Sequence, residues 1–121
     1  MKQPRTIPDY FTRGFLDAMY FMNNLSGSDI SLDVIEENTW SRILESCKEF
    51  LANNFSDSEG QVLRKAKTLG MKAGWDFYMA RNNAGVGFVD NGDWTREKAE
   101  QLQQAARDCG PFEITLAITR R

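Results

Sequence analysis

The sequence predicts an α+β fold, in which about four helices pack on a small three-stranded antiparallel sheet in the order ααα-ββ-α-β. Three observations predict this class. Apolar residues recur at helical spacing over most of residues 9–73 and 95–109. Residues 75–80 and 86–90 are instead rich in aromatic and branched side chains and flank a turn-forming segment, which is typical of a β-hairpin. Residues 112–119 alternate between apolar and polar side chains, the period of a half-buried strand.

The helical part is expected to start after a loose leader, residues 1–8, because Pro4 and Pro8 oppose helix formation. Asp9 can cap a first helix. The apolar positions of that helix are Phe11, Phe15, Ala18, Met19 and Met22. A second helix is predicted from about residue 36 to residue 53. It carries the clearest amphipathic stripe of the chain, formed by Trp40, Ile43, Leu44, Cys47, Phe50 and Leu51.

A third helix is predicted from a cap at Ser56 or Ser58 to about residue 73. Gly70 is expected to weaken its last turn, and Gly74 has the residue type that commonly follows a helix end. A change of pattern after Gly74 marks the start of the predicted hairpin.

Alternate side chains of a strand point to opposite faces, so the first hairpin strand would bury one set and expose the other. If Trp75 and Phe77 are buried, Tyr78 is exposed beside Asp76. The segment 81–85 is the predicted turn, because its asparagines and glycine tolerate positive φ angles.

A fourth helix follows the hairpin, with Asp93 or Thr95 as its cap and Gly110-Pro111 at its end. The two cysteines, Cys47 and Cys109, both fall on apolar helix faces. We expect two buried thiols without a disulfide, since a disulfide would be unusual in a reducing cytosol.

The composition suits one soluble globular domain, residues 1–121, with 41% hydrophobic and 26% charged residues. A net charge of -2 argues against a general nucleic-acid binder. No apolar run is long enough to span a membrane and no apolar signal-peptide core is present, so we expect a cytoplasmic protein. The absence of histidine excludes serine–histidine and cysteine–histidine catalysis and most catalytic zinc sites. Carboxylate, lysine, tyrosine or cysteine chemistry stays open. Because no catalytic constellation stands out, we expect no enzymatic activity, no metal and no cofactor.

The hairpin segment fits much of the pattern AGxDFWxxRNGxGxGFxDR. The fitting residues are Ala73-Gly74, Asp76-Phe77, Arg81-Asn82, Gly85, Gly87-Phe88 and Asp90. In this it resembles a motif of small uncharacterised proteins encoded by tailed bacteriophages. The segments 11–18 and 40–50 are similar to the first two helices of that family. Departures from the pattern occur at Tyr78, Asn83 and Asn91, where the family tends to have tryptophan, glycine and arginine. The resemblance implies a phage origin and a place in the host bacterial cytoplasm, and it implies no activity.

The leading hypothesis is a non-enzymatic phage accessory protein that binds and modulates a host or phage protein, for instance as an inhibitor of a host enzyme or defence system. Loop and turn residues on a rigid scaffold are frequent binding sites. The candidate binding residues are Asp76, Tyr78, Arg81, Asn82, Asn83 and Trp94. Two interpretations of their polar groups remain open. They form a cleft that binds an anion or a partner's carboxylate, or they form a network that only fixes the hairpin.

Other functions use other residues. A small nucleic-acid-binding module would use basic side chains on phosphates, namely Lys65, Lys67, Lys72 and Arg81. A small enzyme would be built on Asp76, Asp90 and Tyr78. A homodimer would use the open edge of the predicted sheet or the aromatic residues of the first helix, Tyr10, Tyr20 and Phe21.

Overall fold

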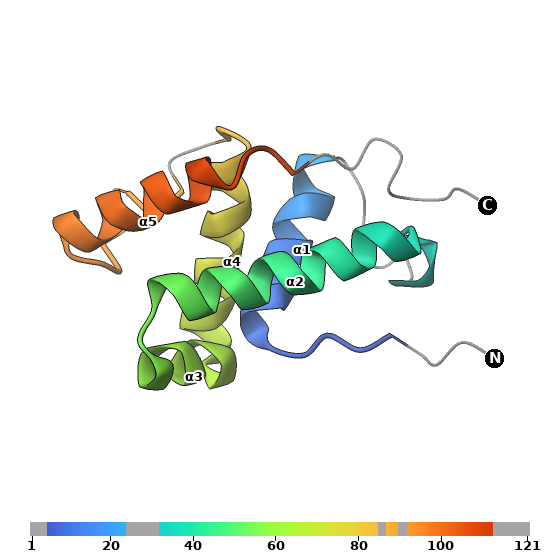
Figure 1. Cartoon of the computed structure of the whole chain (residues 1–121), viewed down its shortest axis with the longest axis horizontal. Coiled ribbons are helices and arrows are strands. Elements are labelled where there is room, and N and C mark those ends of the chain that lie inside the picture. The colour runs from blue at the N-terminus through green and yellow to red at the C-terminus, as the bar shows by residue number, and fades with distance from the viewer. Residues whose placement is uncertain (1–4, 24–31, 85–86, 90–91, 113–121) are drawn as a thin grey trace.

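The computed structural model describes residues 5–23, 32–84, 87–89 and 92–112. These residues form helices and no β-sheet, so the predicted α+β class with a three-stranded sheet is wrong (Figure 1). In chain order the elements are α1 (Tyr10–Met22), a short 3-10 helix η1 (Leu32–Val34), α2 (Glu37–Asn54), α3 (Asp57–Lys65), α4 (Lys67–Arg81) and α5 (Arg96–Asp108).

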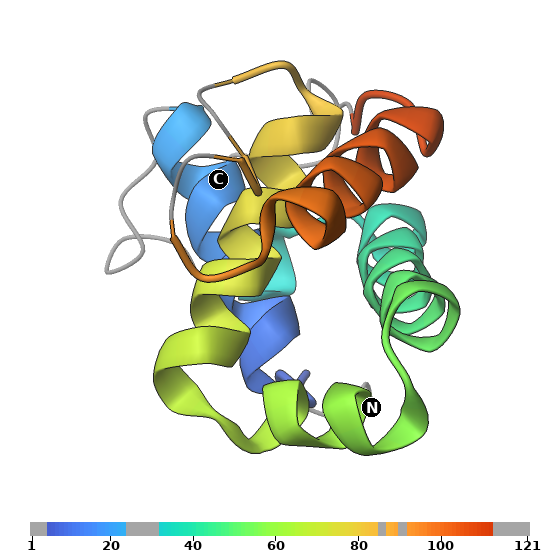
Figure 2. The ribbon, with the colours of Figure 1, turned by 90° about the vertical axis from the view of Figure 1, so that its left-hand side faces the viewer.

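Helices α1 and α4 run side by side in the same direction and form the centre of the fold (Figures 1 and 2). α2 and α5 lie across one side of this pair, and α3 closes the end at which α1 begins. The core lies between the pair and the crossing helices. Its largest fully buried side chains include the rings of Phe11, Phe15, Phe77, Phe88 and Phe112.

The predictions for three helices are confirmed. α1 is capped by Asp9, whose Oδ1 accepts a hydrogen bond from the Thr12 backbone N–H at 2.7 Å. α5 is capped by Thr95, whose Oγ1 accepts from the Lys98 N–H at 3.2 Å. α2 covers the predicted range and buries most of the predicted stripe. Of the two cysteines, only Cys47 is buried, whereas the other lies exposed just after α5.

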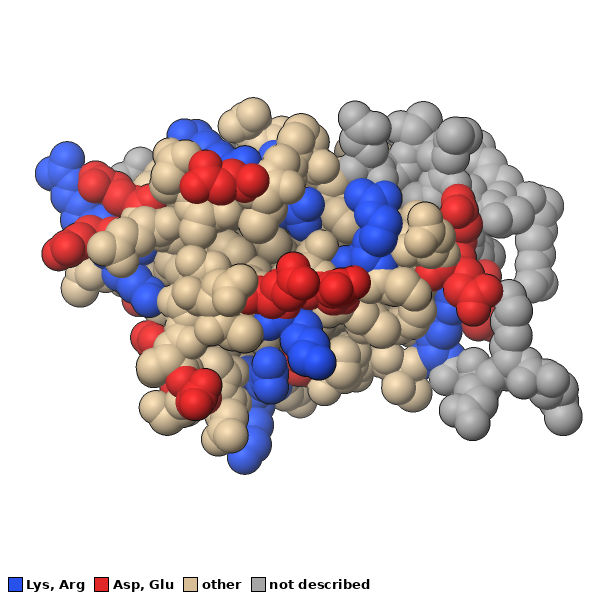
Figure 3. Space-filling view, viewed as in Figure 1, with Lys and Arg blue, Asp and Glu red and all other residues tan. Residues whose placement is uncertain are grey.

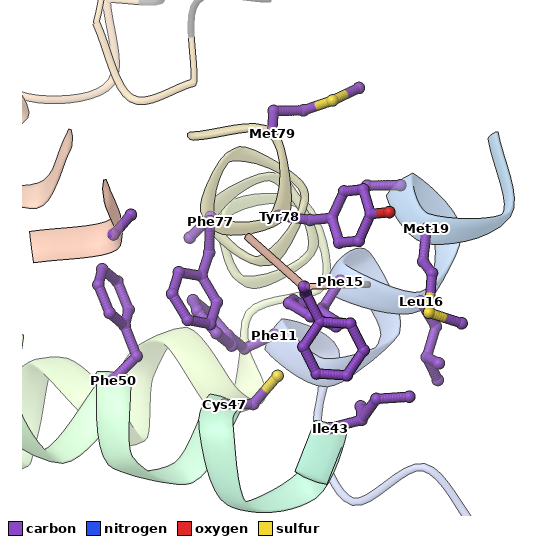
Figure 4. Close-up of a cluster of buried hydrophobic side chains, with 14 of the residues drawn as sticks. Phe11, Phe15, Leu16, Met19, Ile43, Cys47, Phe50, Phe77, Tyr78 and Met79 are labelled. Carbon is purple, nitrogen blue, oxygen red and sulfur yellow. The ribbon is translucent and has the colours of Figure 1, made fainter. Parts of the chain in front are cut away.

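The predicted strand 75–80 is the second half of helix α4. Consecutive side chains there point to different neighbours: in Figure 4, Phe77 points toward Phe50 on α2, while Tyr78 points toward α1. A helix that packs against neighbours on several sides is apolar around its circumference and shows no single stripe. The aromatic content therefore reflects burial on all sides, and tertiary packing overrides the β propensity of these residues.

Glycines explain how α1 and α4 approach so closely. A Cβ atom on Gly14 would collide with the carbonyl oxygen of Met71, and one on Gly74 would collide with the carbonyl oxygen of Phe11. Gly74 is thus an interior helix residue at a helix crossing, and its predicted role after a helix end is wrong. The predicted third helix is two helices, because the chain turns at Ala66 between α3 and α4.

The rest of the predicted sheet is only partly described. Residues 87–89 form a turn, and residues 86 and 90 of the predicted returning strand lie outside the described residues. Of the predicted last strand, only Phe112 is described; it is buried, and residues 113–119 lie outside the described range. Part of the predicted loose leader is attached to the fold, since the Arg5 side chain donates to the carbonyl oxygens of Leu32 and Ile35.

Candidate functional site

Arg81, in the last turn of α4, is buried and holds the end of α5. Its Nε donates to the carbonyl oxygen of Gly110 at 2.8 Å, and its Nη2 donates to that of Cys109 at 3.3 Å. The guanidinium carbon lies 5.3 Å from the ring centroid of Phe77 and 5.2 Å from that of Phe112. A cation is favoured beside the free carbonyl groups at a helix C-terminus. Arg81 therefore acts as a C-terminal cap that one helix supplies to another.

The charge of Arg81 is held without a carboxylate among the described residues. Burial lowers the pKa of its guanidinium, and the nearby Arg42 guanidinium lowers this pKa further. Arg42 also packs on the Phe112 ring, with its guanidinium carbon 4.8 Å from the ring centroid. Two of the three nitrogens of Arg81 already bond backbone carbonyls, while Nη1 has no hydrogen-bond partner in the described part of the chain.

Asn82 completes the attachment of the segment after α5. Its side-chain nitrogen donates to the Tyr78 carbonyl oxygen at 2.9 Å, and its Oδ1 accepts from the Phe112 N–H at 3.1 Å. The next residue, Asn83, has a φ angle of 54°, a left-handed conformation that asparagine tolerates better than most residues. The turn prediction is right for Asn83, which is exposed, although a helix and not a strand precedes the turn.

Tyr78 is buried, with 3% of its surface exposed, so its predicted exposure is wrong. Its ring meets the Phe15 ring edge to face, and its hydroxyl accepts from the Asn23 side-chain amide at 3.3 Å. Burial raises the pKa of this phenol. Asp76 is also buried, at 6% exposure, and lies beside a surface groove described below.

The motif residues after the turn pack under α5. The Phe88 N–H donates to the Gln103 Oε1 at 2.9 Å, and both side chains are buried. Gly87 has a φ angle of 60°, and a Cβ there would press on Gln103 and Ala80. Trp94 is half-buried and packs on Phe55, with ring centroids 5.6 Å apart.

The structure thus brings Tyr78, Arg81 and Asn82 together around the end of α4, where their groups bond α1, α5 and the segment after α5. These contacts correspond to the interpretation in which the motif fixes the fold. The sequence pattern did not indicate this use, because the partners of Arg81 are backbone carbonyls, which carry no sequence signature.

A different surface is open to solvent. α1 and α4 border a groove, here called the α1/α4 groove, with cavities of about 470 Å³ at each end that share Met71. Trp75 lines the groove and is half-buried; beside it lies Phe21, 62% exposed, with the two ring centroids 5.4 Å apart. Met22, which the sequence placed on the buried stripe, is 41% exposed, and Tyr10 is 39% exposed. Tyr20, a predicted dimer residue, is buried. The aromatic excess on the first helix was the available sequence signal for this surface.

Charges divide the α1/α4 groove. One end is lined by three cations and one carboxylate, namely Arg13, Arg64, Lys67 and Asp9. The other end is lined by Gly14, Asp17, Met71, Lys72, Trp75, Asp76 and Gly87. Lys72 forms a 2.7 Å ion pair with Asp93, which raises the pKa of the Lys72 ammonium.

No family model matches the chain, and neither a curated protein nor a solved structure matches it significantly. Within the described residues, none of the helices combines the length and apolar character needed to cross a membrane. The same residues contain no group of three or more aspartate, glutamate or cysteine side chains placed to hold a metal ion.

Proposed function

We propose that this chain is a non-enzymatic phage accessory protein that acts in the host bacterial cytoplasm by binding and modulating a host or phage protein through the α1/α4 groove. The observation that carries the proposal is the exposed Phe21 ring, which packs at a tilt against Trp75 beside the groove. The resemblance to small tailed-phage proteins supports the phage setting.

Removing the exposed apolar surface at this site from water would stabilise a complex with a partner protein. Covering the exposed part of Phe21 stabilises a complex by about 1–2 kcal/mol. Aromatic side chains at the centre of a patch are typical anchors of protein interfaces. Phe21 and Trp75 contact each other from two adjacent helices, and grouped exposed apolar side chains mark interaction sites on small proteins.

The enzyme hypothesis built on Asp76, Asp90 and Tyr78 receives less support. The Tyr78 hydroxyl is bonded to Asn23 inside the fold, and burial raises the pKa of its phenol, which disfavours its use as a base. Asp90 lies outside the described residues.

One observation favours the nucleic-acid alternative. The groove places the cations Arg13, Arg64 and Lys67 around the half-exposed ring of Tyr10, a combination that can contact phosphate and stack on a base. Retention of single-stranded DNA at low salt that disappears on raising the salt would support it. The chain's net charge of -2 weakens this alternative, because it opposes the approach of a long polyanion.

Site-specific photo-cross-linking tests the protein-binding proposal. A photo-reactive phenylalanine analogue replaces Phe21 in one variant and Val62 in a matched control, because Val62 is 56% exposed and lies on α3. In a bacterial host lysate, the position-21 variant is expected to give one dominant cross-linked protein that the position-62 variant does not. Equal cross-linking from both positions, or none from position 21, would refute the proposal.

A further inference from the structure

The two ends of the α1/α4 groove differ in chemistry. The end near the starts of α1 and α4 is cationic, with Arg13, Arg64 and Lys67 around the ring of Tyr10. The other end contains the Trp75 ring, with Phe21 beside it, and is also lined by the charged residues Asp17, Lys72 and Asp76. Met71 lines both cavities and connects them. A ligand that follows the groove therefore meets an excess of cations at one end and an aromatic ring flanked by carboxylates at the other.

Ion pairing inside the protein leaves positive charge at the cationic end. Arg13 pairs with Asp17 at 3.3 Å along α1, so its charge is largely balanced. Within the described residues, Arg64 pairs only with the Asp9 carboxylate, at 4.0 Å, and that carboxylate also accepts from a backbone N–H as the α1 cap. Lys67 is exposed. The arrangement leaves an excess of cations that is accessible to a partner's carboxylates.

The length of the groove sets the size of its occupant. Tyr10 and Phe21 lie three helical turns apart on α1, which is about 16 Å at 1.5 Å per residue. On α4, Lys67, Met71 and Trp75 follow at intervals of four residues and so lie on one face. A helical segment of about eleven residues matches this length.

We infer that the partner inserts an acidic amphipathic segment into the α1/α4 groove, with an apolar side chain against Phe21 and Trp75 and carboxylates against Arg64 and Lys67. This inference rests on the proposed function. Charge complementarity of this kind sets orientation and register, because a reversed segment would place its carboxylates against the aromatic end.

A protein segment fits better than a nucleic acid. The cationic end is short, and the end beyond Met71 is lined by the carboxylates Asp17 and Asp76. A nucleic-acid groove instead follows the phosphate backbone with positive charge over its length. Figure 3 shows the α2 side of the molecule, where acidic side chains over the middle of α2 lie close to basic ones.

Peptide titration followed by NMR tests the inference. The probes are an eleven-residue helical peptide of leucine and glutamate, the same peptide with lysine in place of every glutamate, and a short single-stranded DNA. The acidic peptide is expected to bind about tenfold more tightly than the basic one and to shift the amide signals of Tyr10, Met71 and Trp75. The Arg64→Glu/Lys67→Glu variant is expected to reverse this preference.

The matched control is Lys48→Glu/Arg96→Glu, which makes the same charge change at exposed positions that do not line either cavity of the groove. It is expected to keep the preference for the acidic peptide. Three results would overturn the inference: equal affinity for both peptides, no acidic-peptide binding up to about 1 mM, or tighter binding of DNA at the same residues. If cross-linking from position 21 still identifies a partner, such a result removes only the acidic segment and leaves the proposed function standing.

Discussion

Replacing Arg81 by alanine is expected to destabilise the fold through the attachment of α5. The substitution removes two hydrogen bonds from a charged donor to the carbonyls of Cys109 and Gly110, each worth about 1.5–3 kcal/mol. It also removes the packing of the guanidinium on Phe77 and Phe112, worth about 0.5–1 kcal/mol for each ring.

Two effects reduce the sum. The released carbonyls lie at an exposed to half-buried helix end, so water can partly replace the lost donors. The variant also no longer carries the desolvation cost of a buried cation. We therefore expect the free energy of unfolding to fall by about 3 kcal/mol. For a chain of this length this corresponds to a decrease in Tm of about 10 °C.

Thermal unfolding followed by circular dichroism measures the change, with Arg96→Ala as the matched control. Arg96 is an exposed arginine with one ion pair along its own helix, and its replacement is expected to leave Tm nearly unchanged. Hydrogen exchange adds a local test, since the α5 amides of Arg81→Ala should lose protection before those of α1. A Tm within about 2 °C of the wild type, or an α5 protected as before, would refute the proposed capping role.

Three further predictions concern the fold. Gly74→Ala is expected to lower the free energy of unfolding by more than about 3 kcal/mol or to prevent folding. Gly60→Ala should be tolerated, because the nearest neighbour of its new Cβ would be 3.9 Å away. Soluble yield and urea unfolding compare the two variants, and equal stability would contradict the close α1–α4 crossing. Thr95→Ala should lower the free energy of unfolding by about 1 kcal/mol in the same assay through loss of the α5 cap, and no change would show that the cap is dispensable. Burial raises the pKa of Tyr20 and Tyr78 in the folded state, so the unfolded chain loses its phenolic protons first as pH rises. The free energy of unfolding should therefore stay constant below about pH 10 and decrease above it. A Tyr78→Phe variant whose stability decreases as much as that of the wild type would contradict this.

The helices with one buried face could be predicted from sequence. In α2 the side chains of Trp40, Ile43 and Cys47 repeat at helical spacing, and the structure buries all three. The caps Asp9 and Thr95 were also predictable, since capping depends on residues within one turn. Local periodicity and local hydrogen bonding are properties of neighbouring residues, and the chain displays them directly.

Helix α4 could not be predicted in this way. Its neighbours lie on several sides, so Phe77, Tyr78 and Met79 are all buried although they are consecutive. The same segment reads as an aromatic strand when packing is unknown. Gly74, which precedes this segment, resembles a helix breaker in sequence, whereas it is required at the crossing with α1.

The candidate site shows the same division. The sequence pointed to Arg81, Asn82 and Tyr78 by residue type, but it could not show that α5 and α1 would use their polar groups. It also noted aromatic excess on the first helix, without showing that Tyr20 turns inward and Phe21 outward.

By itself the sequence established the lack of histidine, the balanced charge, and the amphipathic helices with their caps. Only the tertiary structure decided that the chain from Trp75 to Arg81 is helical, that the Arg81 guanidinium caps α5, and that α1 and α4 border an open groove. The physical reason is that burial on several sides, close helix crossing and bonds to distant carbonyls depend on residues far apart in the chain, which no local pattern records.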